Sequence, residues 1–260
     1  MHQPLSYVHQ GAKVDKSVII EPFVTIENNV EIGEGTWVGS NVTIMEGARI
    51  GKNCKIFPGA IISAIPQDLK FNGEISTAVI GDNTTIRECA TINRGTIAQG
   101  KTIIGKNCLL MAYSHVAHDC NIGSQCIIAN GVALAGHVII DDHAIIGGNS
   151  AVHQFVRIGK HSMISGGSLV RKDIPPYVKA AREPLSYIGI NSIGLRRKGY
   201  QEKKIREIQD IYRIIFQKNN NTTQAILKIE TELEPTEERD EIISFINNSG
   251  RGIMKGYKQN

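Results

Sequence analysis

The chain contains few aromatic residues and no long apolar segment. Aromatic residues make up 5% of its 260 residues, and tryptophan occurs once. No run of 18 apolar residues is present, which excludes a typical membrane-spanning helix. The first ten residues, MHQPLSYVHQ, lack the basic and then apolar order of a signal peptide. We therefore expect a soluble, cytoplasmic protein.

Signals for disulfides, phosphate loops and nucleic-acid binding are also missing. The five cysteines are an odd number and none forms a C-x-x-C pair, so we expect no disulfide framework. No glycine-rich loop of the G-x-x-x-x-G-K-[ST] type occurs, so any nucleotide would have to be held by basic and polar side chains. The formal charge of +4, with 21% charged residues, does not indicate a nucleic-acid partner. We expect no cofactor and no bound metal.

A six-residue repeat dominates the first two thirds of the sequence. Stepping by six from Val8 to Val170 gives 28 positions, of which 25 are Ile, Val or Leu. A period of six fits neither an α-helix nor a flat strand, but it fits a coil with three short faces per turn. Each face then contributes one aliphatic side chain to a narrow interior. The repeat therefore predicts a parallel β-helix of hexapeptides.

The repeat is interrupted twice, and glycines follow several of its aliphatic positions. The three positions that are not aliphatic fall within residues 63–77 and 94–101, which we expect to be loops extruded from the coil. Insertions on one face of a solenoid commonly carry binding function. Glycine directly follows several in-phase aliphatics, as at Gly81, Gly105 and Gly123. We expect the backbone to turn there with φ values that favour glycine.

The pattern changes after residues 173–176, the sequence DIPP, where proline cannot donate to a strand ladder. Apolar residues then recur at spacings of three and four, which predicts three amphipathic helices: one from about Gln201, one beyond a break at 219–221 and one after Pro235. We expect a β-helix domain over 1–190 and a helical domain over 191–260 that covers the end of the solenoid.

Histidines gather on neighbouring coils of the predicted β-helix. Residues 18 apart should lie above one another at about the strand spacing of 4.8 Å. This places His118, Gly136 and Gln154 in one column and Asp119 and His137 in the next. A histidine is a natural general base near neutral pH, and a neighbouring carboxylate can fix its tautomer.

Gly136 offers a backbone N–H to an oxyanion with no side chain in the way. The constellation suits acyl transfer from a thioester to a hydroxyl. A histidine in isolation is more often a surface or hydrogen-bonded residue, and histidines on adjacent coils also fit a zinc site. The cysteines at 54, 108, 120 and 126 occupy small inward positions, so packing explains them better than nucleophilic chemistry.

Several motifs together resemble the UDP-N-acetylglucosamine O-acyltransferases of lipid A biosynthesis. They cover the chain from about Val8 to its end and are more specific than the repeat. The matching segments are QDLKF at 67–71, HVAHDC at 115–120, LAGHV at 134–138, IIGGNSAVHQFVRIG at 145–159, DIPPYV at 173–178 and GLRRKGY at 194–200. The resemblance implies a homotrimer of left-handed β-helices, with active sites between subunits. It also implies a 3-hydroxyacyl donor on acyl carrier protein and, as acceptor, UDP-N-acetylglucosamine or its 3-amino analogue.

The resemblance also assigns roles to individual residues. His118 would be the general base, Asp119 its orienting partner and Gly136 the oxyanion donor. The acceptor sugar and its phosphate would contact Asp68 and Lys70, and the nucleotide and diphosphate would contact Asn191 and Arg197. Four further residues would line the cleft: His115, His137, His153 and Gln154.

The far end of the acyl groove would lie at Gly166 and Gly167. Two adjacent glycines leave room there, so we expect a long donor of the 3-hydroxymyristoyl kind. Arg197 also belongs to a cluster of basic residues, which is alternatively a solvated helix face: Arg196, Arg197, Lys198, Lys203, Lys204 and Arg206.

Three other functions remain open at this point. One is the later-acting glucosamine N-acyltransferase of the same pathway, which generally carries an extra domain before its repeats, whereas the period here begins at Val8. Another is a zinc lyase similar to the γ-class carbonic anhydrases, which bound zinc would reveal. The last is a scaffold without catalysis, which would leave the aligned His, Asp and Gln residues unexplained.

Overall fold

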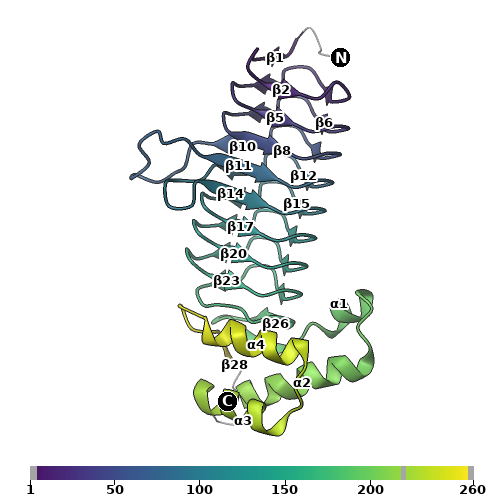
Figure 1. The fold of residues 1–260 in the computed structure, drawn as a ribbon, viewed down its shortest axis with the longest axis vertical. Helices are drawn as coiled ribbons and strands as arrows, with labels where there is room; N and C mark the ends of the chain where they lie inside the picture. The colour runs from purple at the N-terminus through teal and green to yellow at the C-terminus, as the bar shows by residue number, and fades with distance from the viewer. Residues whose placement is uncertain (1–4, 218–220, 257–260) are drawn as a thin grey trace.

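The computed structural model describes residues 5–217 and 221–256, which form a three-sided β-helix with helices at its C-terminal end (Figure 1). Three parallel sheets of short strands form the sides. In order along the first sheet, sheet A, the strands are β1 (Tyr7–Val8), β4 (Thr25–Ile26), β7 (Thr43–Ile44), β10 (Ile61–Ala64), β13 (Thr91–Asn93), β16 (His115–Val116), β19 (Ala133–Leu134), β22 (Ala151–Val152) and β25 (Leu169–Val170).

The other two sides are built in the same way. Sheet B contains β2 (Lys13–Val14), β5 (Glu31–Ile32), β8 (Ala48–Ile50), β11 (Thr77–Ile80), β14 (Lys101–Ile104), β17 (Asn121–Ile122), β20 (Ile139–Ile140) and β23 (Arg157–Ile158). Sheet C contains β3 (Ile19–Ile20), β6 (Trp37–Val38), β9 (Lys55–Ile56), β12 (Thr85–Ile86), β15 (Leu109–Leu110), β18 (Ile127–Ile128), β21 (Ile145–Ile146), β24 (Met163–Ile164), β26 (Val178–Ala181), β27 (Ser186–Ile190) and β28 (Lys255–Gly256).

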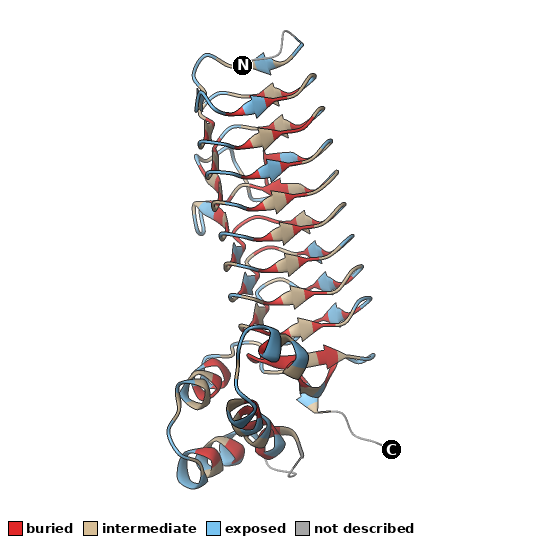
Figure 2. Ribbon diagram, turned by 90° about the vertical axis from the view of Figure 1, so that its right-hand side faces the viewer, coloured by how far each residue is buried: buried red, intermediate tan, exposed pale blue. Residues whose placement is uncertain are grey.

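The in-phase aliphatic residues form the core, as the repeat predicts. From β3 to β25, each two-residue strand presents its second residue to the interior, and Ile26, Ile44 and Ile128 are completely buried. Figure 2 shows the same burial pattern repeated in coil after coil. Paired strands in uninterrupted coils are 18 residues apart, for example Val116 opposite Leu134. Because each coil packs on its neighbours through these aliphatics, the stack fixes the position of every turn between them.

Both predicted loops are confirmed, and both leave the solenoid at the same corner. Residues 65–76 connect β10 to β11, and residues 94–100 connect β13 to β14. Each therefore joins sheet A to sheet B, and the first protrudes furthest from the stack in Figure 1. Strand pairing continues past the loops, with Ile50 opposite Ile80 and Ile80 opposite Ile104. We call this edge of the solenoid the A/B corner.

The expectation about the glycine corners is wrong. Gly81 and Gly105 do not have positive φ, whereas Asn83 and Asn107, two positions further along, do. The glycines are required because the coils stack closely there: a Cβ on Gly105 would lie 2.5 Å from the carbonyl carbon of Gly123. Asparagine tolerates the left-handed conformation better than most residues, so it can adopt the positive φ of these turns two residues after the glycine.

The solenoid ends in a helical region. After the prolines, β26 pairs parallel with β24 and antiparallel with β27, and β28 returns to pair with β27. The three predicted helices are α2 (Glu202–Gln217), α3 (Thr222–Glu232) and α4 (Glu237–Asn247). Asn221 caps α3, and the other two residues of the predicted break, 219 and 220, lie outside the described residues. A fourth helix, α1 (Ser192–Arg197), was not predicted.

Among the described residues, no helix combines the length and apolar character needed to cross a membrane.

Candidate active site

His118 and Asp119 form a buried pair in the turn between β16 and β17, at the A/B corner. His118 Nδ1 lies 2.8 Å from Asp119 Oδ2, and only 7% and 4% of the two residues is exposed. Asp119 is in the left-handed conformation, with a φ of 59°. An ionised carboxylate can only accept, so it favours the tautomer with the proton on Nδ1, and in a neutral imidazole of this form the lone pair is on Nε2.

The predicted stacking of Gly136 on His118 is confirmed. A Cβ built on Gly136 would lie 2.6 Å from His118 Cε1 and 2.7 Å from Nε2, closer than real side chains approach. Only glycine fits over the free edge of this imidazole. The Gly136 N–H donates to no acceptor within the described ranges. This places a free backbone donor next to the basic nitrogen of His118.

His137 and Phe155 continue the Asp119 column. His137 Nε2 lies 3.7 Å from Asp119 Oδ2, and its ring stacks on Phe155 with centroids 4.6 Å apart. Phe155 was not predicted as part of the site, although its position 18 residues after His137 could have indicated it. Its stacking fixes the plane of the His137 ring beside the carboxylate.

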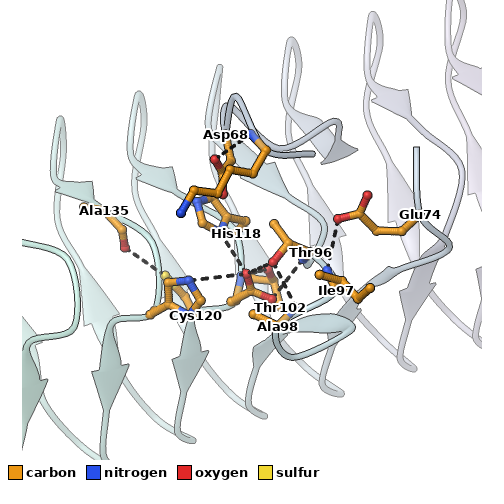
Figure 3. Close-up of polar contacts among 12 residues, drawn as sticks. Asp68, Glu74, Thr96, Ile97, Ala98, Thr102, His118, Cys120 and Ala135 are labelled. Atoms are coloured by element: carbon orange, nitrogen blue, oxygen red, sulfur yellow. Dashed lines mark hydrogen bonds and ion pairs between the residues drawn. The ribbon is translucent and has the colours of Figure 1, made fainter. Parts of the chain in front are cut away.

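The Asp119 carboxylate is held by the second loop (Figure 3). Thr96 donates its backbone N–H to Oδ1 at 2.9 Å and its hydroxyl to Oδ2 at 2.6 Å. Asp119 N–H in turn donates to the Thr102 hydroxyl at 2.8 Å. Burial raises the pKa of the Asp119 carboxyl, but hydrogen bonds from Thr96 and His118 outweigh it, so its pKa lies below the usual value.

The other residues predicted near the catalytic pair lie around the A/B corner. His115 is on β16, in the same coil, and its Nδ1 is 2.8 Å from the Thr91 hydroxyl. Burial, and after it the charge of His118, lower the His115 pKa, which favours a neutral imidazole. Gln154 is half-buried one coil beyond Gly136, and the exposed His153 lies beside it.

Asp68 and Lys70 are on the first loop, where Lys70 N–H donates to Asp68 Oδ1 at 3.0 Å. Figure 3 shows Asp68 on the side of the solenoid that carries His118. Lys70 is exposed and Asp68 is half-buried, so both remain accessible to a ligand.

Asn191 and Arg197 lie at a different corner of the same chain. Asn191 caps α1, with Oδ1 accepting from Gly194 N–H and Nδ2 donating to the His161 carbonyl. Lys198, next to the exposed Arg197, donates to Gln125 Oε1 at 2.9 Å. Gln125 is in the turn between β17 and β18, where sheet B meets sheet C. A single chain therefore does not bring Arg197 beside His118.

Gly166 and Gly167 lie at the third corner, in the turn between β24 and β25. Gly167 has a φ of 71°, which favours glycine by itself. Gly166 does not, but a Cβ there would come within 3.0 Å of the Gly148 carbonyl oxygen. Their place in an acyl groove stays a prediction.

The site fits general acid–base catalysis by His118 better than it fits a metal ion or a nucleophilic cysteine. One ligand atom from each of His118, Asp119 and His137 lies within 4.8 Å of the others, as a metal site would require. Hydrogen bonds from Thr96 and His118, however, already occupy both Asp119 oxygens. Cys120 donates its thiol to the Ala135 carbonyl, and burial raises its pKa to about 12, so it remains a thiol at neutral pH.

The chain is similar to known acyltransferases over almost its whole length. Family models described as the second domain of UDP N-acetylglucosamine O-acyltransferase and as a bacterial transferase hexapeptide match residues 173–254 and 101–136. The acyl-[acyl-carrier-protein]–UDP-N-acetylglucosamine O-acyltransferase of Anaeromyxobacter dehalogenans is 42% identical over 253 residues, 97% of this chain and 98% of that protein.

Solved structures show the same similarity. The UDP-N-acetylglucosamine acyltransferase of Bacteroides fragilis is 52% identical, with a TM-score of 0.96 over 98% of this chain and all of that one. The enzyme of Francisella novicida is 42% identical, with a TM-score of 0.95 over 98% of this chain and 94% of that one.

Proposed function

Because this chain belongs to the UDP-N-acetylglucosamine O-acyltransferase family of lipid A biosynthesis, we propose that it uses His118 as general base to transfer a 3-hydroxyacyl chain. The donor is the 3-hydroxyacyl thioester of acyl carrier protein. The acceptor is the 3-position of UDP-N-acetylglucosamine or of its 3-amino analogue. This would be the first step of lipid A biosynthesis. The observation that supports the role of His118 most directly is its Nε2, which lies free beside Gly136 while Nδ1 is tied to Asp119.

The geometry supports a reaction in two steps, in which the acceptor oxygen adds to the thioester carbonyl and the carrier thiolate then leaves. His118 Nε2 takes the proton of the acceptor hydroxyl as that oxygen attacks the thioester carbonyl, and the carbonyl oxygen becomes an oxyanion. Gly136 N–H donates to this oxyanion, and Asp119 stabilises the imidazolium. The intermediate then releases the carrier thiolate, which receives the proton back from His118. An ester and a free thiol result.

A homotrimer would complete the site. Arg197 and His118 lie at different corners of one solenoid, yet the proposed acceptor must reach both the catalytic pair and the residues that hold its diphosphate. A second copy packed side by side can bring its sheet B/sheet C corner to the A/B corner of the first. Cyclic symmetry with three copies closes such a heterologous contact and repeats the site three times.

The activity is tested by acyl transfer with purified protein. We expect turnover with UDP-N-acetylglucosamine or its 3-amino analogue and a long 3-hydroxyacyl carrier protein, and 10²–10⁴-fold less turnover in His118→Ala, the usual contribution of a general base. Near-normal kcat with an unchanged pH profile in His118→Ala would contradict the assignment. Comparison of the two acceptors distinguishes ester from amide formation. Stoichiometric zinc in active protein would instead support metal chemistry.

A further inference from the structure

The second extruded loop places one residue against the catalytic pair from outside the hexapeptide repeat. Thr96 is 5% exposed, and both its backbone N–H and its hydroxyl point at Asp119. The two contacts reach different carboxylate oxygens, so together they fix the rotation of the carboxylate about its Cβ–Cγ bond. Figure 3 shows Thr96 next to Ile97 and Ala98 of the same loop, with dashed lines that mark its hydrogen bonds.

The shared oxygen is the important one. Asp119 Oδ2 accepts both the Thr96 hydroxyl at 2.6 Å and the His118 Nδ1 proton at 2.8 Å, while His137 Nε2 lies at 3.7 Å. Within the described part of the chain, the Thr96 backbone N–H is the donor to Oδ1, and the Thr96 hydroxyl is the donor that shares Oδ2 with His118. The orientation of the His118 ring depends on the same oxygen.

The loop that carries Thr96 is itself firmly attached. Gly95 N–H donates to Thr77 O at 3.1 Å, and Ala98 N–H donates to the Thr96 hydroxyl at 3.2 Å. The first loop also contacts it, because Glu74 accepts from Ile97 N–H at 3.1 Å. Thr96 is thus held at a defined position relative to the coil that bears Asp119.

We propose that Thr96 is a positioning residue for acyl transfer: it locks the Asp119 carboxylate so that Oδ2 faces His118 Nδ1. This inference rests on the proposed role of His118 as general base. Thr96 itself does not touch the reacting atoms. It acts through Asp119, by keeping that group ionised and pointed at the imidazole, which in turn presents Nε2 to the acceptor.

The test is Thr96→Val, which replaces the hydroxyl by a methyl group of similar size. We expect kcat to fall about 10- to 100-fold, because a charge-assisted hydrogen bond on the catalytic pair is lost. We also expect the acidic limb of the kcat/KM profile to move toward higher pH, because the Thr96 hydrogen bonds lower the pKa of the Asp119 carboxyl and a carboxylate that loses such a donor interacts more strongly with the proton of the catalytic pair. Thr96→Ser keeps the hydroxyl and should restore kcat to within about threefold.

A matched control and a double-mutant cycle separate positioning from general stability. Thr84 is also a buried threonine, whose hydroxyl donates to Gly105 O and accepts from Cys108 N–H, but it lies away from the A/B corner. Thr84→Val should lower the melting temperature without moving the pH profile. In an Asp119→Ala background, Thr96→Val should change kcat by less than about twofold, because the carboxylate through which Thr96 acts is already absent.

Each outcome is decisive. An unmoved acidic limb in folded Thr96→Val, or full additivity with Asp119→Ala, would overturn the proposal. If the valine variant does not fold, Thr96→Ala takes its place, and the Asp119 pKa measured by carbon-13 NMR gives a readout independent of turnover. Loss of the proposed function itself would show differently, as wild-type protein without acyl transfer.

Discussion

At the scale of single residues, the closest constraint on the site is the contact between Gly136 and His118. The backbone φ of Gly136 is not in the positive range, so alanine would be tolerated by the chain itself. Its Cβ would nevertheless lie 2.6 Å from the imidazole. The ring, and not the backbone, is therefore what demands glycine.

We expect Gly136→Ala to lower kcat at least about 10²-fold, because the displaced imidazole no longer meets the acceptor in line. Steady-state kinetics with saturating substrates measure this, and circular dichroism verifies the fold. Gly250→Ala, where an added Cβ meets no atom within 4 Å, is the control. Unaltered kcat in Gly136→Ala would show that the His118 ring lies elsewhere in the working enzyme.

His161 links the solenoid to the helical region and should make stability depend on pH. It is stacked between His143 and Tyr177, with centroids 4.5 Å and 5.9 Å away. Burial, followed by the charges of His143 and Lys160, lowers its pKa to about 4. Between about pH 4 and pH 6.5, the imidazole is therefore neutral in the folded protein and protonated in the unfolded chain.

A lowered histidine pKa gives stability that is complete above about pH 6.5 and declines as the pH falls toward about 4. Because His161 is only 7% exposed and its pKa is lowered to about 4, we expect it to account for a loss on the order of 2 kcal/mol over this range. Urea unfolding at pH 7 and pH 4.5 measures the change. His161→Phe keeps a flat ring without a proton site and should lose less stability over this interval; an equal loss in both proteins would assign the effect to other groups.

At the scale of elements, the two extruded loops support each other. Glu74 accepts from Ile97 N–H with one oxygen and from Asn72 N–H with the other, at 3.1 Å and 2.8 Å. The Arg94 guanidinium of the second loop lies over the Phe71 ring of the first, 5.6 Å from its centroid. The loop that carries Asp68 and Lys70 is therefore anchored to the loop that holds Asp119.

We expect Glu74→Ala to raise the KM for the sugar nucleotide about 3- to 10-fold and to change kcat less, since the first loop loses an anchor while Thr96 stays bound to Asp119. The KM for the acyl carrier protein should remain close to that of the wild type. Glu34→Ala, which removes an exposed ion pair with Lys52, provides the control. If Glu74→Ala impaired both substrates equally, the loop would not be specific for the acceptor.

How much could be predicted from the sequence varies with the element. His118 beneath Gly136 followed from the repeat, because uninterrupted coils place residues 18 apart in contact whatever their side chains. Thr96 could not be found in this way, since the path of a loop outside the repeat has no period. The helix α1 was missed because its six residues bury only Leu195 and so give no helical periodicity. The roles of Asn191 and Gly166 rest on resemblance and remain predictions.

At the scale of the whole molecule, the separation of His118 from Arg197 predicts that sites are shared between subunits. Mixed trimers of His118→Ala and Arg197→Ala would contain some interfaces with both residues intact. Random assembly makes this about a quarter of the interfaces. Assayed below the KM of the sugar nucleotide, the mixture should recover about that fraction of wild-type activity.

The control is the same pair of variants purified separately and combined without exchange of subunits. It should show only the average of the two weak activities. If co-assembled trimers behaved like this control, each chain would contain a complete site, and the proposed division of the nucleotide-binding and catalytic residues between neighbours would be excluded.

The two loops at the A/B corner should differ in how much their lengths can vary among related proteins. Strand pairing continues across the loops, with a shift of register between Ile62 and Ala64, so the length of residues 65–76 is not set by the pairing of the coils above and below. If the first loop binds the acceptor as proposed, acceptor recognition can therefore change by insertion or deletion there while the chemical step stays constant. The neighbouring loop has no such freedom, because shortening it would withdraw Thr96 from Asp119. Natural variation should accordingly be broad in the first loop and narrow in the second.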